Sequence, residues 1–251
     1  MGRGRSKLGG GGGPANTVSR GGAASGPFKK FATTTEDEWD YAGDGDDTID
    51  FFKKNSNYSE LIDEMDEDER EAFEAWCSGI MMGGTQYLGW DGMGVEAQKL
   101  TRTYDKYLDR ATLDTSVELR RLATPELVLG AGHKNATLEE LKAMKGRIVT
   151  SKGNMSTAAA SEGLGIGSDS SKPVEYAFKI PAGSTGAGMW IGDSRINGWR
   201  AKQREFMMNR DTSFMVGKTT YDKKRGKYIV EMEYVGLGEH DYGSSGKRGR
   251  R

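Results

Sequence analysis

The sequence has little of two residues that often build sites: one cysteine, Cys77, and two histidines, His133 and His240. A single cysteine excludes a disulfide framework and a cysteine-based zinc site. Two histidines are too few for a histidine-rich metal centre, and they leave little for serine–histidine or cysteine–histidine catalysis. His240 lies in a polar C-terminal stretch and His133 in a glycine-rich loop, so both are expected to be solvated. The chemistry is therefore expected to need no metal.

Long hydrophobic runs are also missing. No apolar segment reaches the length of a membrane span, and the N-terminus lacks the hydrophobic region of a secretory signal. No G-x-G-x-x-G follows a strand, so a Rossmann dinucleotide site is not supported. We expect a chain without a membrane span, acting in the cytoplasm of the producing cell or of a target host cell. Carriage in a virion, or secretion without a signal peptide, stays open.

Charge is distributed in blocks, although the formal net charge is only −1. Residues 1–30 carry basic side chains and no acid, residues 36–74 are heavily acidic, and residues 247–251 are basic again. Such blocks usually form solvated, self-repelling segments, and basic tails allow a weak electrostatic contact with nucleic acid. These shifts predict four segments, which are a disordered arm at 1–35, an acidic linker at 36–58, a folded domain at 59–238 and a basic tail at 239–251.

The folded part begins with helical patterns. Apolar residues recur at helical spacing from residue 59 to 76 and from 97 to 111, and these stripes are expected to be core. Residues 79–94, rich in glycine and aromatics, are expected to form a packed loop or a broken helix. Thr137 and Glu140 make a capping box that opens a short helix.

Strand patterns follow the helices. Five segments read as strands: 117–121, 174–180, 205–208, 213–216 and 228–235. The charged residues 223–227 read as a hairpin turn between the last two. Helices first and a mainly antiparallel sheet afterwards indicate an α+β fold rather than a doubly wound sheet.

Gln203 and Glu205 are the most informative pair. Two residues apart, their side chains share one face if the segment is extended. An amide beside a carboxylate packs poorly but can grip a polyhydroxylated ligand. Two other elements precede them in the chain: an arginine ending a strand, Arg120, and a hydroxyl pair after a glycine turn, Ser156 and Thr157. Read singly, each has a plain structural explanation as a solvated strand end, a turn or an edge-strand face.

In this order and spacing, the three elements resemble the mono-ADP-ribosyltransferases of the arginine–serine–glutamate class. That class contains clostridial binary toxins, Rho-modifying exoenzymes and several tailed-phage enzymes. The resemblance runs from about residue 60 to 235, and it includes residues 107–111, 174–181 and 209–214. It implies N-terminal helices packed on a mainly antiparallel split β-sandwich. It also implies NAD as the substrate and a protein, expected to be a host protein, as the acceptor.

The resemblance implies a role for each site residue. Glu205 would stabilise the positive charge that develops on the ribose when the nicotinamide bond breaks, as in other glycosyl transfers. Arg120 would hold the diphosphate or ribose of NAD, with the adjacent Arg121 as the alternative. Ser156 would orient the glutamate and the nicotinamide ribose, with Thr157 beside it in the cofactor-binding set.

The acceptor side of the site falls to Gln203, which would grip the acceptor side chain, and to Trp199 as a recognition aromatic. In this class a glutamine at the position of Gln203 accompanies asparagine modification, and a glutamate there accompanies arginine modification. The sequence departs from the family pattern at Ala158, where a serine is usual, and at Arg121, where a glycine is common. The acceptor is therefore left as asparagine, glutamine or arginine.

Two other functions fit the same residues. In NAD glycohydrolysis, water would replace the protein acceptor. Alternatively, the chain would be a non-catalytic binding or virion-associated protein on a degenerate transferase fold, a reading that the basic arm and tail favour.

Overall fold

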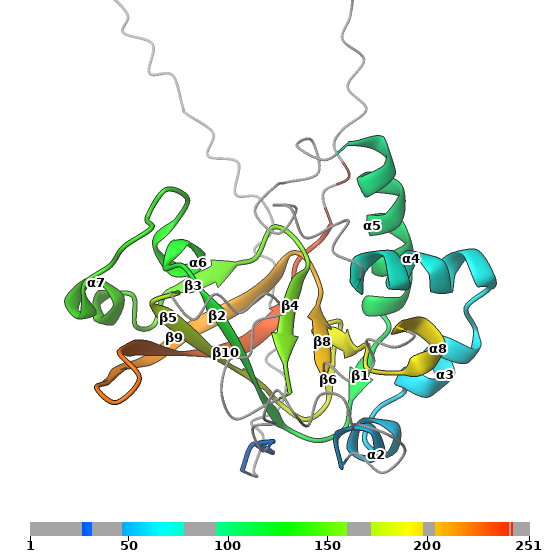
Figure 1. The fold of residues 1–251 in the computed structure, drawn as a ribbon, viewed down its shortest axis with the longest axis horizontal. Coiled ribbons are helices and arrows are strands. Elements are labelled where there is room, and N and C mark those ends of the chain that lie inside the picture. The colour runs from blue at the N-terminus through cyan, green and yellow to red at the C-terminus, as the bar shows by residue number, and fades with distance from the viewer. Residues whose placement is uncertain are drawn as a thin grey trace, which may run out of the picture.

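The computed structural model describes residues 27–31, 47–77, 94–159, 172–197, 204–240 and 242. The N-terminal helices of this part gather at one side of the sheet, beside β7 and β8 (Figure 1). They are α2 (Asp47–Lys54), α3 (Tyr58–Asp63), α4 (Glu67–Cys77) and α5 (Val95–Leu108). Three short helices follow later in the chain: α6 (Glu126–Leu129), α7 (Leu138–Ala143) and α8 (Ser194–Asn197).

Eight of the described strands form one hydrogen-bonded sheet in the order β3-β9-β10-β5-β2-β4-β8-β7. Their bounds are β2 (Val117–Ala123), β3 (Ile148–Thr150), β4 (Met155–Ala158), β5 (Val174–Ile180), β7 (Gly188–Trp190), β8 (Glu205–Met208), β9 (Thr212–Asp222) and β10 (Lys227–Leu237). A second, two-stranded sheet pairs β1 (Thr112–Leu113) with β6 (Ser184–Thr185). The pair β10 and β5 is parallel, and the other described pairs are antiparallel. The predicted α+β class with a mainly antiparallel sheet is confirmed.

Local patterns located most elements correctly. The predicted strands 117–121, 174–180 and 205–208 match β2, β5 and β8, and the capping box of Thr137 and Glu140 opens α7 as expected. The helix expected over 59–76 is in fact two helices. Asp66 and Glu69 cap one another, with a backbone N–H of each bound to the carboxylate of the other, so a new helix begins there. Residues 79–93 of the expected loop lie outside the described residues.

The folded part begins earlier in the chain than the composition predicted. Lys29 pairs with the start of β2 through two backbone hydrogen bonds. The Lys29 N–H donates to the Ser116 carbonyl, and the Glu118 N–H donates to the Lys29 carbonyl. Phe31 is buried and stacks on Phe52, with ring centroids 5.7 Å apart. The placement of 27–31 in the disordered arm and of all of 36–58 in a linker was therefore wrong. Buried aromatic rings anchor these two segments despite their charged surroundings.

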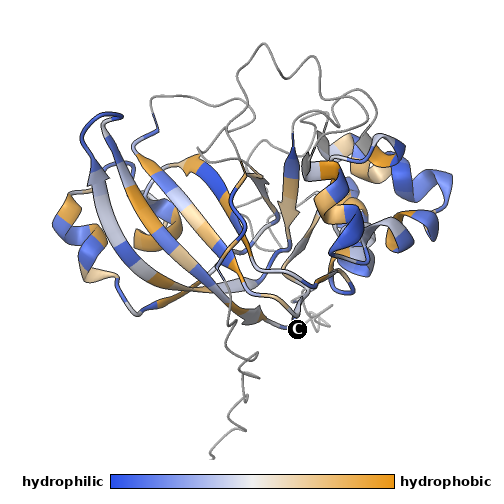
Figure 2. Ribbon diagram, turned by 90° about the horizontal axis from the view of Figure 1, so that it is seen from below, coloured by the Kyte–Doolittle hydropathy of each residue, from blue (hydrophilic) through white to orange (hydrophobic). Residues whose placement is uncertain are grey.

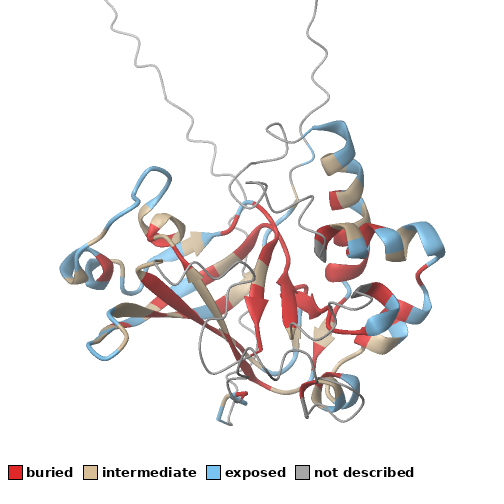
Figure 3. Cartoon of the chain, in the orientation of Figure 1, coloured by how far each residue is buried: buried red, intermediate tan, exposed pale blue. Residues whose placement is uncertain are grey.

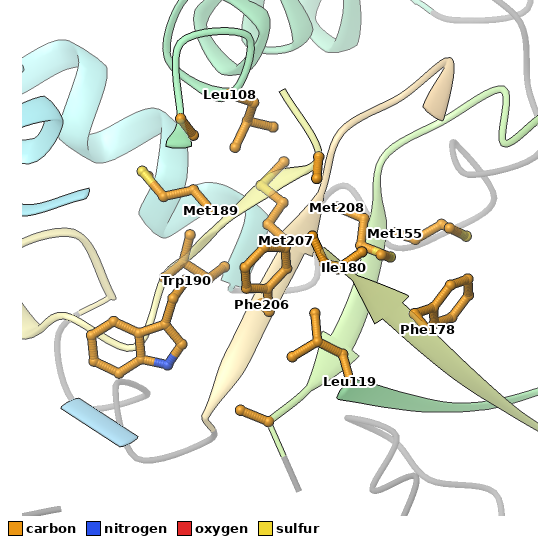
Figure 4. Packing of buried hydrophobic residues seen from close by; sticks show 14 of the residues in the cluster. Leu108, Leu119, Met155, Phe178, Ile180, Met189, Trp190, Phe206, Met207 and Met208 are labelled. Atoms are coloured by element: carbon orange, nitrogen blue, oxygen red, sulfur yellow. The ribbon is translucent and has the colours of Figure 1, made fainter. Parts of the chain in front are cut away.

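The core follows the alternation of the strands. Figure 2 shows hydrophobic and hydrophilic residues alternating along them, and Figure 3 shows β8 buried along its length. In the close-up of Figure 4, Phe206 and Met207 of β8 lie beside Met189 and Trp190 of β7. Neighbouring side chains of β8 point to opposite faces, so both faces of this strand are covered.

The join between β2 and β4 is narrow. These strands share one paired position, Arg120 opposite Ala158, whereas β2 and β5 pair along seven. The sheet is therefore split into a five-stranded part ending at β2 and a three-stranded part of β4, β8 and β7. Figure 1 shows β4 and β8 running at an angle to β2.

Phe52 tests whether the N-terminal segment belongs to the fold. Its fully buried ring stacks on Trp190 with centroids 5.5 Å apart and also contacts Tyr58 and Phe206. We expect Phe52→Ala to lower the free energy of unfolding by about 3–5 kcal/mol, because it removes a large side chain from a closed core. Denaturant unfolding would measure this, with Val95→Ala at an exposed position as the control. If Phe52→Ala lowered the free energy of unfolding as little as Val95→Ala, the packing of Phe52 in the core would be contradicted.

Candidate active site

Arg120, Ala158 and Glu205 lie side by side on three neighbouring strands. Arg120 of β2 is directly opposite Ala158 of β4, and Ala158 is directly opposite Glu205 of β8. Directly paired residues point to the same face, so arginine and glutamate share a face with only an alanine between them. Since strands are about 4.8 Å apart, the two Cα atoms are about 10 Å apart. The register thus brings together an arginine and a glutamate that are 85 positions apart in the sequence.

The Arg120 guanidinium is held from two sides by carboxylates. Nη1 donates to Glu175 Oε1 at 2.9 Å and Nη2 donates to Glu118 Oε1. Both carboxylates are buried, and the arginine itself is 13% exposed. These bonds use two of the five N–H groups of an arginine, so three remain for a ligand as far as the described residues show. Such a held, planar donor set suits a diphosphate.

Ser156 and Thr157 face opposite sides of β4 and have different surroundings. Ser156 is half-buried on the face of Ala158, and no described residue hydrogen-bonds its hydroxyl group. The Thr157 hydroxyl is buried and donates to the carbonyl of Phe206 at 2.8 Å. Within the described part of the chain, the Ser156 hydroxyl thus has no partner, whereas the Thr157 hydroxyl joins β4 to β8.

Glu205 is the first residue of β8 and is 1% exposed. Trp76 of α4 donates its indole N–H to Glu205 Oε1 at 3.0 Å, so the helical side of the domain orients this carboxylate. Trp76 was expected to be a core residue, and it is buried, but its bond to Glu205 has no local sequence pattern that could have predicted it. Arg204, directly before Glu205, has φ of 49°, a left-handed conformation that is uncommon outside glycine. Strained backbone of this kind concentrates at functional sites.

Arg121 has different hydrogen-bond partners from Arg120. Its Nη1 donates to the backbone carbonyl of Ser156, across the join where β2 and β4 stop pairing. It is opposite the buried Tyr176 and shares the face of the hydrophobic core residues of β2. Arg121 therefore lies on the core face of β2, whereas Arg120 shares the face of Glu205.

Gln203 and Trp199, assigned to acceptor recognition, lie outside the described residues. Their roles stay predictions.

His240 belongs to a buried charged network and is not solvated, so that prediction was wrong. Its ring contacts Asp109 at 2.8 Å and Asp211 at 3.2 Å, and its side chain is 6% exposed. Burial by itself lowers the pKa of His240, but hydrogen bonds to Asp109 and Asp211 and the charge of Asp105 outweigh it and raise that pKa to about 9. The carboxylates therefore keep this imidazole charged at neutral pH.

Arg210 is the centre of that network. Its guanidinium is buried and bonds Asp105 of α5 through Nε and Nη2, at 3.1 and 2.9 Å, and Asp211 through Nη1 at 3.0 Å. Tyr242 covers it, with the ring centroid 4.8 Å from the guanidinium carbon. Arg210 lies in the turn that carries the chain from β8 to β9, so the network fixes the end of the strand that Glu205 begins.

A sequence profile of the ADP-ribosyltransferase exoenzyme family matches residues 93–235, which is more than half of the chain. The chain belongs to this family. It is therefore an NAD-dependent ADP-ribosyltransferase, as the sequence analysis inferred. No curated protein sequence matches significantly.

Solved structures of the family share the fold. The Clostridium limosum C3 exoenzyme is 17% identical with a TM-score of 0.60, covering 83% of this chain and 98% of its own. The Paenibacillus larvae toxin Plx2a is 19% identical with a TM-score of 0.59, covering 78% and 97%. C3stau2 from S. aureus, solved with NAD, is 14% identical with a TM-score of 0.58, covering 82% and 99%. At these identities the likeness concerns the fold.

Two further findings concern the described residues of the transferase only. None of their helices is long and apolar enough to cross a membrane. Within the same residues, no cluster of three or more histidine, cysteine, aspartate or glutamate side chains could hold a metal ion.

Lysine substitutions separate the two arginines of the transferase. We expect Arg120→Lys to weaken NAD binding about tenfold or more, because an ammonium cannot bridge two carboxylates and still present a planar set of donors. We expect Arg121→Lys to lower the free energy of unfolding by about 1–3 kcal/mol, with a smaller effect on NAD affinity, because it loosens the bond to Ser156. Calorimetric titration with NAD and denaturant unfolding would measure the two effects. The reverse pattern would assign the site to Arg121.

The charged state of His240 predicts a pH-dependent stability. The folded pKa of about 9 lies above the unfolded value of about 6.5. Its contribution is therefore complete below about pH 6.5 and is lost as pH rises through 9. We expect His240→Gln to lose up to about 3 kcal/mol relative to wild type at pH 6 and much less at pH 10. Unfolding at both pH values measures this, with His133→Gln, on an exposed loop, as the control. A difference in free energy of unfolding between wild type and His240→Gln that does not change with pH would contradict the charged network.

Proposed function

We propose that this transferase moves ADP-ribose from NAD to a side chain of a protein, using Arg120, Ser156 and Glu205, and releases nicotinamide. The observation that carries the assignment is the shared register of Arg120, Ala158 and Glu205 at the split of the sheet. The Arg120 guanidinium and the Glu205 carboxylate lie on one face, and their charges are opposite to those of the two parts of the substrate that they are proposed to contact. The substrate is anionic at its diphosphate and becomes cationic at the reacting ribose.

In the chemical step, the bond between ribose C1′ and the nicotinamide nitrogen breaks, and its electron pair leaves with nicotinamide. The ribose then carries positive charge as an oxocarbenium-like species, to which the acceptor atom bonds while losing a proton. Glu205 is suited to stabilise that charge because its carboxylate is buried and already oriented by the Trp76 N–H, so it needs little reorganisation.

Arg120 and Ser156 supply the groups that position the substrate. Arg120 offers its remaining N–H donors to the diphosphate or the ribose, and both neighbours across the sheet, Ala158 and Ala177, end at Cβ. No side chain at those paired positions therefore reaches beyond the arginine. The Ser156 hydroxyl, two residues from Ala158 on the same face, is placed to contact the nicotinamide ribose or Glu205. Thr157 supports this segment through its bond to β8.

The acceptor is proposed to be an asparagine, glutamine or arginine side chain of a host protein. Gln203, two residues before Glu205, and Trp199 are the residues proposed to recognise it. A glutamine at this place favours an amide acceptor, as in the Rho-modifying members of the class. Nucleic-acid contact is proposed only as weak attraction to the basic segments at 1–30 and 247–251. The proposed place of action is the cytoplasm of the producing or the target cell.

The test is NAD consumption in a host lysate with NAD labelled in its adenylate. We expect wild type to release nicotinamide and to label a discrete protein, and Glu205→Gln to lower the rate by about 10²- to 10³-fold. Glu139→Gln is the matched control, because Glu139 is exposed and its carboxylate pairs with Lys142 at the surface.

Three outcomes separate the candidate functions. Label on a protein, lost in Glu205→Gln, supports the transferase. Nicotinamide release without protein label makes the chain an NAD glycohydrolase. No turnover by the folded wild type in lysate leaves a binding protein on a transferase fold.

A further inference from the structure

Glu175 binds two arginines from different parts of the chain. It is the second residue of β5 and is fully buried. Arg120 Nη1 donates to its Oε1 at 2.9 Å. Arg225 donates to both oxygens, with Nη1 at 2.7 Å from Oε2 and Nη2 at 3.3 Å from Oε1. A buried carboxylate is costly unless it is paired, so this sharing sets the geometry of both guanidinium groups.

Arg225 comes from the charged turn between β9 and β10, which was predicted as a hairpin and otherwise has no role in the site. Asp222 fixes it from the other side, with Oδ2 accepting from Nε at 2.7 Å. Asp222 Oδ1 also accepts the backbone N–H groups of Lys224 and Arg225, which shapes the turn. Arg225 is thus held in place although it is 25% exposed.

The bond from Arg225 to Glu175 limits the number of hydrogen bonds that Arg120 can form with this carboxylate. A carboxylate that faces a single arginine commonly takes it in a bidentate pair, with two parallel N–H bonds. Here Arg225 occupies Oε2, and Arg120 keeps one bond, to Oε1. The remaining N–H groups of Arg120 are thereby kept from this carboxylate.

We propose that Arg225 is a positioning residue for NAD binding: it occupies Glu175 so that Arg120 can direct its guanidinium at the diphosphate or ribose. The inference rests on the proposed function of Arg120. It gives the 222–226 turn a part in substrate binding although the turn belongs to the opposite part of the split sheet from Glu205.

The test compares Arg225→Ala with Lys224→Ala in the full chain. Both remove one positive charge from the same turn, but the Lys224 side chain is exposed and has no contact with Glu175. We expect Arg225→Ala to raise the Kd and KM for NAD about five- to tenfold, with kcat changed less than twofold, because Arg120 turns into the vacated carboxylate oxygen. Lys224→Ala should change the Kd less than twofold. Thermal melts of each variant show that the fold is retained.

A double-mutant cycle with Glu175→Gln shows whether Arg225 acts through this carboxylate. If it does, Arg225→Ala should cost little NAD affinity in the Glu175→Gln background. Arg225→Gln, which keeps much of the side-chain length, is the second variant should the alanine variant fail to fold, and the same weakening is expected.

Three results would overturn the inference. They are equal effects of Arg225→Ala and Lys224→Ala on NAD affinity, an undiminished effect in the Glu175→Gln background, and a loss of kcat with unchanged Kd. The kcat comparison requires that wild type turns over NAD, whereas the Kd comparisons require only that it binds NAD. Failure of wild type to turn over NAD is a failure of the proposed function and is seen separately.

Discussion

The single pairing of Arg120 with Ala158 is the constraint on which the site depends. A fully paired ladder would keep β2 and β4 side by side along their length, whereas here the two parts of the sheet diverge from one paired position. The polar side chains of the site lie at that point, and Arg121 ties the diverging strands by its bond to the Ser156 carbonyl. The same position that joins the two parts of the sheet therefore places Arg120 and Glu205 of the proposed site on one face.

Two buried charge networks hold the two ends of the site, and each burial of charge has to be offset by pairing. At one end, Glu118 and Glu175 hold Arg120; at the other, Asp105 holds Arg210 after β8. Replacing such pairs by apolar residues is often neutral for stability, so stability alone explains them poorly. Their common effect here is orientation, because in each network carboxylates hold an arginine guanidinium by directional hydrogen bonds.

Five of the ten described strands were predicted because alternation is a local property, and so was the capping box of α7. The order of three motifs singled out Arg120, Ser156 and Glu205, and the register of β2, β4 and β8 places these residues on one face. What failed depends on contacts distant in sequence. Phe31 and Phe52 lie in charged or glycine-rich surroundings and become core only when they stack on one another and, for Phe52, on Trp190. His240 looked solvated because its aspartates are 29 and 131 residues away in the chain.

The hydrogen bond from Trp76 to Glu205 links the packing of the helices to the proposed catalytic carboxylate. Through this contact α4 reaches the carboxylate proposed to face the ribose, so docking of the helical side of the domain helps to orient that group. The aromatic stack of Phe31, Phe52 and Trp190 contacts Phe206, on the face of β8 opposite to Glu205. A segment that composition assigned to a linker thus packs against the strand that bears the glutamate. Loss of its docking should therefore reach Glu205 through the packing around β8, without any contact between the segment and NAD.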